Sequence, residues 1–284
     1  MFRLCNNLYR QQKKENKMKV TPVKQHYIDF GDSSLEQFIS EYRATPLRSL
    51  RKDMVEALNM QTNLDWLQAR QGHITASNIS KFLTGGRSKN EFFGDTAKAV
   101  VNQYLDEKAD SCFDDLASRV ETYQMKQGLI FEKRALQLFQ QQTGLVASDE
   151  IGFISDTIDG IDFGASPDAV IYNKDGSIDA IIEIKCRTGA EFRAERDKLG
   201  NKATVEQMQM AMLLADCPRA YLVMYDIAND RIQYIAWTRG LAFKRRLKEQ
   251  IGFAKEYIEN QKQMDKFTNL KEHLLIDGTY DETL

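Results

Sequence analysis

The feature that most constrains the fold of this sequence is a pair of β-rich runs joined by a polar turn. Residues 169–172 and 177–185 are rich in apolar side chains, and the segment between them, residues 173–176, is polar and ends in Asp175-Gly176. An Asp-Gly pair between two such runs is a strong signal for a β-hairpin, because glycine readily adopts the positive φ of a tight turn. The sequence therefore predicts two antiparallel strands whose register can be counted from the turn.

Three charged side chains are predicted to share one face of this hairpin. With a two-residue turn, Asp168 lies directly opposite Glu183, and Lys185 follows on the same face. A four-residue turn shifts the pairing by two residues, which leaves the face unchanged. The isoleucines around Glu183 make this strand too apolar for a solvated edge. Two carboxylates and an ammonium are therefore expected to lie together on a rigid surface.

This group of charges points to metal-dependent chemistry. Two neighbouring carboxylates repel and raise each other's pKa unless a cation lies between them. Oxygen ligands favour magnesium or manganese, so Asp168 and Glu183 are candidate ligands of such an ion. Lys185 fits the role of a side chain that positions or helps to deprotonate a metal-bound water, or that stabilises charge on a phosphate.

A fourth charged residue, Glu132, lies on an apolar face of a predicted helix over residues 122–142. Leu129, Ala135 and Leu136 lie three or four residues from it and Phe139 lies seven residues away, so all four share its helical face. An unpaired carboxylate in such a place costs several kcal/mol, so something must compensate its charge. A metal shared with the hairpin would do so, and so would a salt bridge to an arginine.

The chain as a whole is predicted to be α/β (α+β), with a central mixed β-sheet flanked by helices. Residues 1–45 are expected to form a partly disordered N-terminal extension, residues 46–266 the folded domain, and residues 267–284 a C-terminal tail. Periodicity predicts helices over residues 34–43, 47–59, 75–83, 91–108, 122–142, 204–215 and 241–263. It predicts strands over residues 151–155, 161–165, 169–172, 177–185, 220–226 and 231–237.

Composition excludes several classes of protein. No run of about 18 uncharged apolar residues occurs, so no membrane span is predicted, and residues 1–19 are basic without the apolar region of a signal peptide. The four cysteines are scattered, which argues against a zinc or iron–sulfur site and favours a reducing compartment. The three histidines are dispersed, and no phosphate-binding loop occurs. A net charge of −2 neither supports nor excludes DNA as a partner.

Six short motifs occur in an order that resembles the YqaJ-like viral recombinase family, which includes phage lambda exonuclease and belongs to the PD-(D/E)xK nuclease superfamily. The resemblance runs from about Leu64 to Trp237, over more than half of the chain. The motifs are Trp66-Leu67-Gln68-Ala69-Arg70, Ile74-Thr75-Ala76-Ser77, Gly128 with Glu132, Ser166-Pro167-Asp168, Glu183-Ile184-Lys185-Cys186 and Gln207-Met208-Gln209. The resemblance implies a restriction-endonuclease-like core.

The resemblance also implies a role for each matching residue. The metal ligands would be Asp168, Glu183, Glu132 and the main-chain carbonyl of Ile184, with Lys185 as the catalytic lysine. Gln207 would lie near that lysine and the attacking water. A second group, formed by Arg70, Ser77 and Ser166, would bind the 5′-phosphate of a DNA end. A guanidinium can bind phosphate through two parallel hydrogen bonds, and hydroxyls add further donors.

Two positions depart from the family pattern. Ala169 stands where glycine is common, which a strand tolerates, and Arg187 stands where proline is frequent. The mixed-charge stretch after it, residues 187–202, is therefore expected to be a loop of different shape. That loop either follows a phosphate backbone or is simply solvated.

The function expected from these features is a magnesium-dependent (or manganese-dependent) 5′-to-3′ exonuclease on double-stranded DNA, acting in viral-type recombination by single-strand annealing. Two alternatives stay open, namely a structure-specific or site-specific endonuclease of the same fold, and a non-catalytic DNA-end-binding protein. Expected partners are duplex ends and a single-strand annealing protein, and the resemblance implies a homotrimer. The expected location is the cytoplasm of a host cell.

Overall fold

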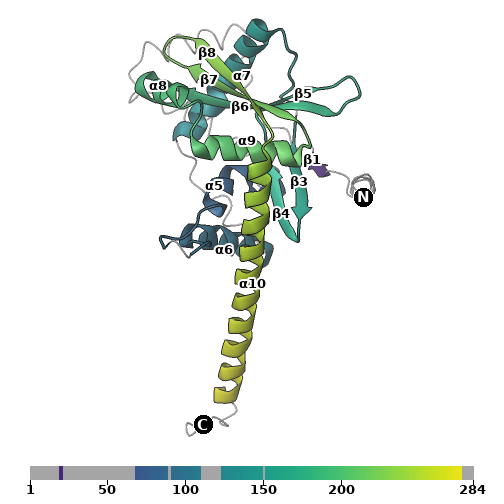
Figure 1. The fold of residues 1–284 in the computed structure, drawn as a ribbon, viewed down its shortest axis with the longest axis vertical. Coiled ribbons are helices and arrows are strands. Elements are labelled where there is room, and N and C mark those ends of the chain that lie inside the picture. The colour runs from purple at the N-terminus through teal and green to yellow at the C-terminus, as the bar shows by residue number, and fades with distance from the viewer. Residues whose placement is uncertain (1–18, 22–67, 89–90, 110–122, 150, 277–284) are drawn as a thin grey trace, which may run out of the picture.

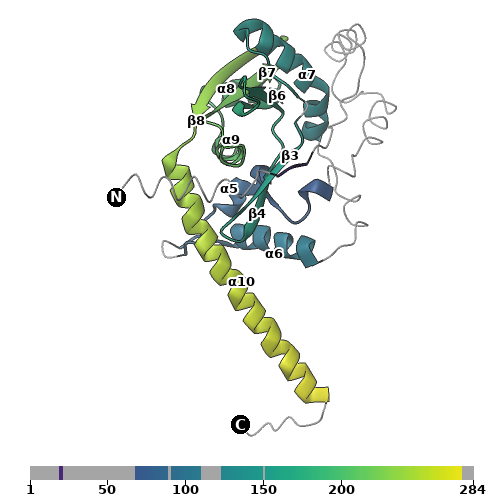
Figure 2. The ribbon, with the colours of Figure 1, turned by 90° about the vertical axis from the view of Figure 1, so that its right-hand side faces the viewer.

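The computed structural model describes residues 19–21, 68–88, 91–109, 123–149 and 151–276. They form a mixed α/β body from which one long helix projects (Figures 1 and 2). The elements in chain order are β1 (Lys19–Thr21), β2 (Ile74–Thr75), η2 (Ala76–Asn78), α5 (Ile79–Phe82), α6 (Asp95–Ala109), α7 (Tyr123–Thr143), β3 (Phe153–Ile158), β4 (Ile161–Ala165), β5 (Ala169–Tyr172), β6 (Ile178–Arg187), α8 (Gly189–Asp197), α9 (Lys202–Leu214), β7 (Arg219–Asp226), β8 (Arg231–Thr238) and α10 (Leu241–Ile276).

The central sheet has the order β5-β6-β7-β8 and is mixed, as predicted. Strand β6 is antiparallel to β5 and parallel to β7, and β7 is antiparallel to β8. Helix α7 covers one face of this sheet and α9 the other (Figure 2). Side chains of β6 therefore alternate between two cores: Ile182 and Ile184 pack on the α7 side, and Ile181 packs on the α9 side.

A second sheet has the order β1-β3-β4-β2 and meets the first where β4 leads into β5. Strands β3 and β4 are antiparallel, whereas the two-residue strand β2 is parallel to β4 and pairs Thr75 with Gly164. Strand β1 pairs antiparallel with β3, so residues 19–21 of the expected N-terminal extension belong to the folded body.

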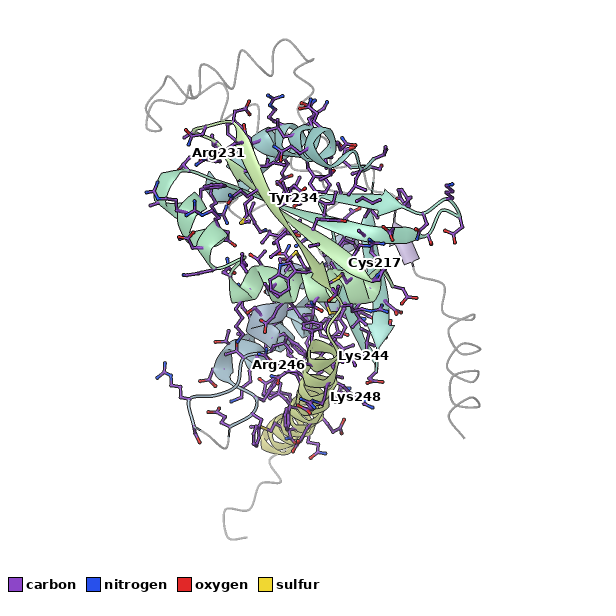
Figure 3. The ribbon with its side chains drawn as sticks, turned by 45° about the horizontal axis from the view of Figure 1, so that its top comes forward. Cys217, Arg231, Tyr234, Lys244, Arg246 and Lys248 are labelled. Atoms are coloured by element: carbon purple, nitrogen blue, oxygen red, sulfur yellow. The ribbon has the colours of Figure 1, made fainter. Side chains whose placement is uncertain are left out.

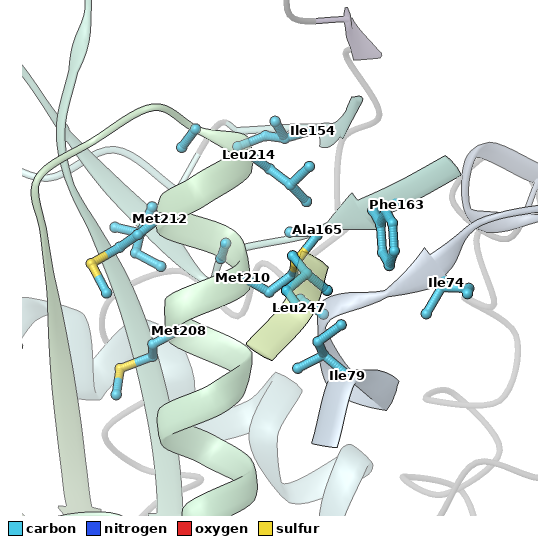
Figure 4. Packing of buried hydrophobic residues seen from close by; sticks show 14 of the residues in the cluster. Ile74, Ile79, Ile154, Phe163, Ala165, Met208, Met210, Met212, Leu214 and Leu247 are labelled. Carbon is cyan, nitrogen blue, oxygen red and sulfur yellow. The ribbon is translucent and has the colours of Figure 1, made fainter. Parts of the chain in front are cut away.

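Helix α9 lies between the two sheets and is buried on most of its surface. Figure 4 shows Met210 near Ala165 of β4 and Leu247 of α10, while Met208 and Met212 point to another side of the helix. All three methionines are fully buried. The unbranched methionine side chain suits a helix that must pack against several layers at once.

Helix α10 begins on the body and extends beyond it. Its first turns pack through Leu247, Ile251 and Ala254, which are buried. The helix continues to Ile276, past the end predicted at residue 263 and into the segment expected to be a tail. None of the helices among the described residues combines the length and the hydrophobicity that a membrane-spanning helix needs.

The hairpin turn differs from the predicted two-residue turn, yet the register of the site is unchanged. The Asn173 N–H donates to the Ser177 carbonyl, which makes a longer turn, and Tyr172 pairs with Ile178. The next pair is Ile171 with Ala180, so one strand carries an extra residue, a β-bulge. The longer turn and the bulge shift the pairing in opposite directions.

The stretch expected to be a loop, residues 187–202, contains helix α8. Its apolar signal is a single fully buried residue, Phe192, over whose ring the Arg231 guanidinium lies 5.5 Å from the centroid. Buried Glu195 accepts hydrogen bonds from the main chain and side chain of Asn201, which also caps α9. Because polar contacts hold this helix, periodicity did not reveal it.

Other boundaries shift by a few residues. The predicted helix over residues 75–83 is preceded by strand β2, which includes Thr75, and α6 begins at Asp95 instead of residue 91. Gly94 precedes α6 and its carbonyl accepts a hydrogen bond from the Lys98 N–H. The helices predicted over residues 34–43 and 47–59 lie outside the described residues, as do Leu64 and Trp66.

Gly164 is predicted to be essential for packing. A Cβ added there would overlap the ring of buried Phe153, so Gly164→Ala is expected to lower the free energy of unfolding by about 1–3 kcal/mol. The matched control is Gly252→Ala on α10, where nothing beyond the adjacent residues and the helix's own backbone lies within 4 Å of the added Cβ. This change is expected to raise stability by roughly 0.5–1 kcal/mol. Urea denaturation measures both, and equal stability of Gly164→Ala and the wild type would contradict the packing argument.

Candidate active site

Three of the predicted site residues come together at the centre of the mixed sheet. Pairing of Ala169 with Ile182 places Asp168, one residue earlier, level with Glu183. The Ile184 N–H donates to Asp168 Oδ2 at 2.6 Å, and Lys185 Nζ donates to Glu183 Oε1 at 2.5 Å. Glu183 is only 3% exposed, so its carboxylate depends on protein partners for stabilisation.

Gln207 brings a fourth side chain to the same carboxylate. It lies on α9, which covers this face of the sheet, and its Nε2 donates to Glu183 Oε1 at 2.7 Å. One oxygen of Glu183 therefore receives an ammonium from its own strand and an amide from the covering helix. The resemblance alone placed Gln207 near the lysine, and the structure shows that the two converge on the same atom.

Glu132 approaches the group from α7. Ala135, Leu136 and Phe139 of its helix are buried, as the periodicity predicted, and Glu132 itself is half-buried. Burial raises the pKa of Glu132 to about 7; the Lys185 charge opposes this shift and the Glu183 charge adds to it. Glu132 is therefore within electrostatic reach of the hairpin residues.

The charges of the site are unbalanced. Burial, followed by the charges of Glu183 and Glu132, raises the pKa of Asp168 well above its ordinary value. Burial alone would lower the pKa of Lys185, but the charges of Glu183 and Asp168 outweigh it and raise that pKa. One lysine thus faces three carboxylates, and an added cation would relieve the remaining repulsion.

The oxygen ligands of the site are of the type that binds a hard divalent cation, although the carboxylates are not arranged as a complete coordination shell. Within the described ranges, no three His, Cys, Asp or Glu side chains form a ready metal-binding cluster. Asp168 and Glu183 each direct an oxygen to a protein donor. Oxygen atoms with an excess of negative charge are nevertheless the ligands that magnesium and manganese prefer.

A small pocket joins this group to the residues predicted to bind a 5′-phosphate. Its lining includes all three of those residues, Arg70, Ser77 and Ser166, together with the carboxylate residue Glu183 and the amide residue Gln207. An Arg70 nitrogen, Nη2, lies 3.4 Å from Ser77 Oγ. Residues that are far apart in the sequence thus line the same pocket.

The parallel pairing of β2 with β4 explains how the pocket forms. Parallel strands end at the same edge of a sheet, so the residues that follow Thr75 and those that follow Ala165 lie side by side. These residues carry Ser77 on η2 and Ser166 in the turn to β5. Packing of α9 against η2 closes the other side of the pocket.

Thr75 is a pocket residue that was not among the predicted site residues. It is buried, lines the pocket, and its Oγ1 lies 3.0 Å from Ser77 Oγ. Its place in one of the six motifs was the available signal, but its role depends on the β2–β4 pairing, which a two-residue strand does not reveal. The buried free thiols of Cys186 and Cys217 do not line the pocket.

The sequence around this site matches a known protein family. The model of the YqaJ-like viral recombinase domain matches residues 65–218, which is more than half of the chain. The chain belongs to the YqaJ-like viral recombinase family. No curated protein matches the sequence at a significant level.

Among solved structures, this chain resembles the alkaline exonuclease LHK-Exo from Laribacter hongkongensis. The complex of LHK-Exo with dAMP has a TM-score of 0.57 and 20% identity, covering 73% of this chain and 98% of that chain. A second LHK-Exo structure has a TM-score of 0.54 and 20% identity, with 72% and 98% covered. At this identity the likeness establishes the fold, and the predicted fold class is confirmed.

The raised pKa of Glu132 predicts a pH-dependent loss of stability without divalent cations. Its pKa is about 7 in the folded chain against an ordinary 4.5, so the folded form holds the proton more tightly. Stability from this group is complete at low pH and falls as the pH rises from about 4.5 to about 7. Relative to Glu132→Gln, the wild type should lose at least about 2 °C in Tm between pH 5 and pH 8 in EDTA. If the Tm of the wild type and the Tm of Glu132→Gln change equally with pH, the raised pKa of Glu132 is refuted.

Proposed function

We propose that this chain is a magnesium-dependent (or manganese-dependent) 5′-to-3′ exonuclease on double-stranded DNA. The observation that carries the proposal is the shared pocket, in which Arg70, Ser77 and Ser166 face Glu183 and Gln207. A phosphate held by the first group lies beside the carboxylate and amide of the second. Membership in the recombinase family and the fold of an alkaline exonuclease support it.

The proposed metal ligands are the carboxylates of Asp168, Glu183 and Glu132, with the main-chain carbonyl of Ile184. A bound magnesium or manganese ion would supply a water of lowered pKa and positive charge beside the phosphate oxygens. The carboxylates fit this task because burial and mutual repulsion already raise the pKa of Asp168 and Glu132.

Lys185 is proposed to act as a fixed positive charge and hydrogen-bond donor. The neighbouring carboxylates raise its pKa, which keeps the ammonium protonated at neutral pH. In this protonated form Lys185 is proposed to orient the attacking water and to stabilise charge on the phosphate. Gln207, on the same Glu183 oxygen, is proposed to hold that carboxylate and the water in place.

The reaction is hydrolysis of a phosphodiester. The water oxygen forms a bond to phosphorus, the bond from phosphorus to the 3′-oxygen of the terminal nucleotide breaks, and that oxygen takes up a proton. The shortened strand is left with a new 5′-phosphate. Each cut therefore regenerates the group that the Arg70, Ser77 and Ser166 pocket is proposed to bind.

The two alternative functions, an endonuclease and a non-catalytic DNA-end-binding protein, do not require all of the contacts at this site. An endonuclease of the same fold needs no site for a terminal phosphate, whereas the pocket places Arg70 and Ser77 next to the charged group. A non-catalytic DNA-end-binding protein needs neither Lys185 nor Gln207 on the Glu183 carboxylate. The proposed setting is recombination by single-strand annealing in a host cytoplasm, with an annealing protein as partner and a homotrimer as the assembly.

Lys185→Ala is expected to lower the rate of cleavage by at least about a hundredfold, because the charge that stabilises the reacting phosphate is lost. Duplex binding, measured by fluorescence anisotropy in calcium, should change little. Lys255→Ala, an exposed lysine of α10, is the control and should keep full activity. Since Lys185 also supports buried Glu183, circular dichroism should establish that the variant is folded. Full activity of folded Lys185→Ala would exclude the proposed site.

Arg70→Ala is expected to abolish the preference for 5′-phosphorylated ends. The assay follows magnesium-dependent digestion of linear 5′-phosphorylated, linear 5′-hydroxyl and closed circular duplexes. The wild type should digest phosphorylated ends at least about tenfold faster than hydroxyl ends, since two charge-assisted hydrogen bonds are lost with the phosphate. It should leave circles intact. Cleavage of circles would favour the endonuclease, and no digestion at all would favour the non-catalytic binder.

A further inference from the structure

Arg246 of α10 is hydrogen-bonded to α9, which contributes Gln207 to the pocket lining, and to the end of α5, which directly follows the segment that carries the lining residue Ser77. Its Nη1 donates to Oε1 of Glu206 on α9, and its Nη2 donates at 2.6 Å to the carbonyl of Leu83, the residue that follows α5. Figure 3 shows Arg246 on the side of α10 away from Lys244 and Lys248. A planar guanidinium can hold two acceptors in a fixed relation, which a lysine does less rigidly.

The bond to Glu206 acts on the wall that carries Gln207. Glu206 directly precedes Gln207 on α9, and its side chain is only 9% exposed. Lys202 Nζ lies 4.0 Å from the same oxygen, on a side chain that is 71% exposed, so Arg246 is the closer and better shielded cation. A buried carboxylate that loses its cation is strongly destabilised. Arg246 therefore constrains the position of α9 at the residue next to Gln207.

The bond to Leu83 acts on the wall that carries Ser77. Helix α5 continues directly from η2, in which Ser77 lies, and Leu83 is the C-terminal cap of α5. A cation at a helix C-terminus complements the exposed carbonyls there. Arg246 thus holds the α5–η2 segment against α9 without itself lining the pocket.

We propose that Arg246 is a positioning residue for the 5′-phosphate: by joining α9 to α5, it sets the spacing between Gln207 with Glu183 on one wall and Ser77 on the other. This inference rests on the proposed function, because it concerns the use of the same pocket. Arg246 does not line the pocket, so it acts through Glu206 and Leu83. A shift of about 1 Å in such a site can cost up to a hundredfold in rate.

The test compares digestion of 5′-phosphorylated and 5′-hydroxyl duplexes by four variants, well below the Tm of each. Arg246→Ala should raise KM for phosphorylated ends at least about tenfold and change kcat/KM for hydroxyl ends less than about threefold. Glu206→Gln should reproduce this loss of preference if Arg246→Ala does not fold. Arg246→Lys should recover part of the preference. Arg245→Ala, an exposed neighbour on the same helix, should behave as the wild type.

Amide hydrogen exchange tests whether Arg246 joins α5 to α9, and it does not depend on nuclease activity. In Arg246→Ala, amides of residues 79–84 and 202–207 should exchange faster than in Arg245→Ala. A wild type without preference for phosphorylated ends refutes the proposed function. If the wild type prefers phosphorylated ends and a folded Arg246→Ala or Glu206→Gln variant keeps that preference, only the positioning role of Arg246 is overturned. Unchanged exchange in both segments also overturns it.

Discussion

The site depends on one buried carboxylate, that of Glu183, and on the two donors that share its Oε1. Lys185 reaches this oxygen from the same strand and Gln207 reaches it from α9. A carboxylate that is 3% exposed is stable only when hydrogen-bonded and paired with charge. The interaction therefore ties the central sheet to the helix that covers it, and the position of α9 becomes part of the position of the site.

The hairpin shows why the face of a site is easier to predict from a sequence than the turn that produces it. The turn is longer than predicted, yet Asp168 still lies level with Glu183 because a β-bulge beside Tyr172 compensates. Burial on both sides of the sheet enforces this outcome, since a slip of one residue would move Glu183 and Lys185 into the apolar core beside α7. The alternation of β6 thus carried more information than the Asp-Gly pair.

The pocket residues could be named by resemblance, whereas local patterns give no sign that they meet. Ser77 and Ser166 are brought together by strand β2, whose two residues show no periodicity, and by a parallel pairing between distant segments. Helix α8 has no periodic signal for a related reason, because its burial rests on Phe192 and on the polar contacts of Glu195. Local sequence reveals amphipathic helices and strands. A site formed by segments that are distant in the sequence depends on tertiary contacts, which periodicity does not encode.

Stability and function oppose each other at this site. Burial and repulsion raise the pKa of Glu132 and Asp168, so the carboxylates destabilise the ion-free fold when they are charged. The same repulsion is the free energy that a divalent cation would release on binding, so a chain that is weakened by its charges would be stabilised by the ion. Lys185 removes only part of this repulsion, since it is one positive charge among three carboxylates. A second lysine among them would stabilise the fold and weaken the attraction for an ion.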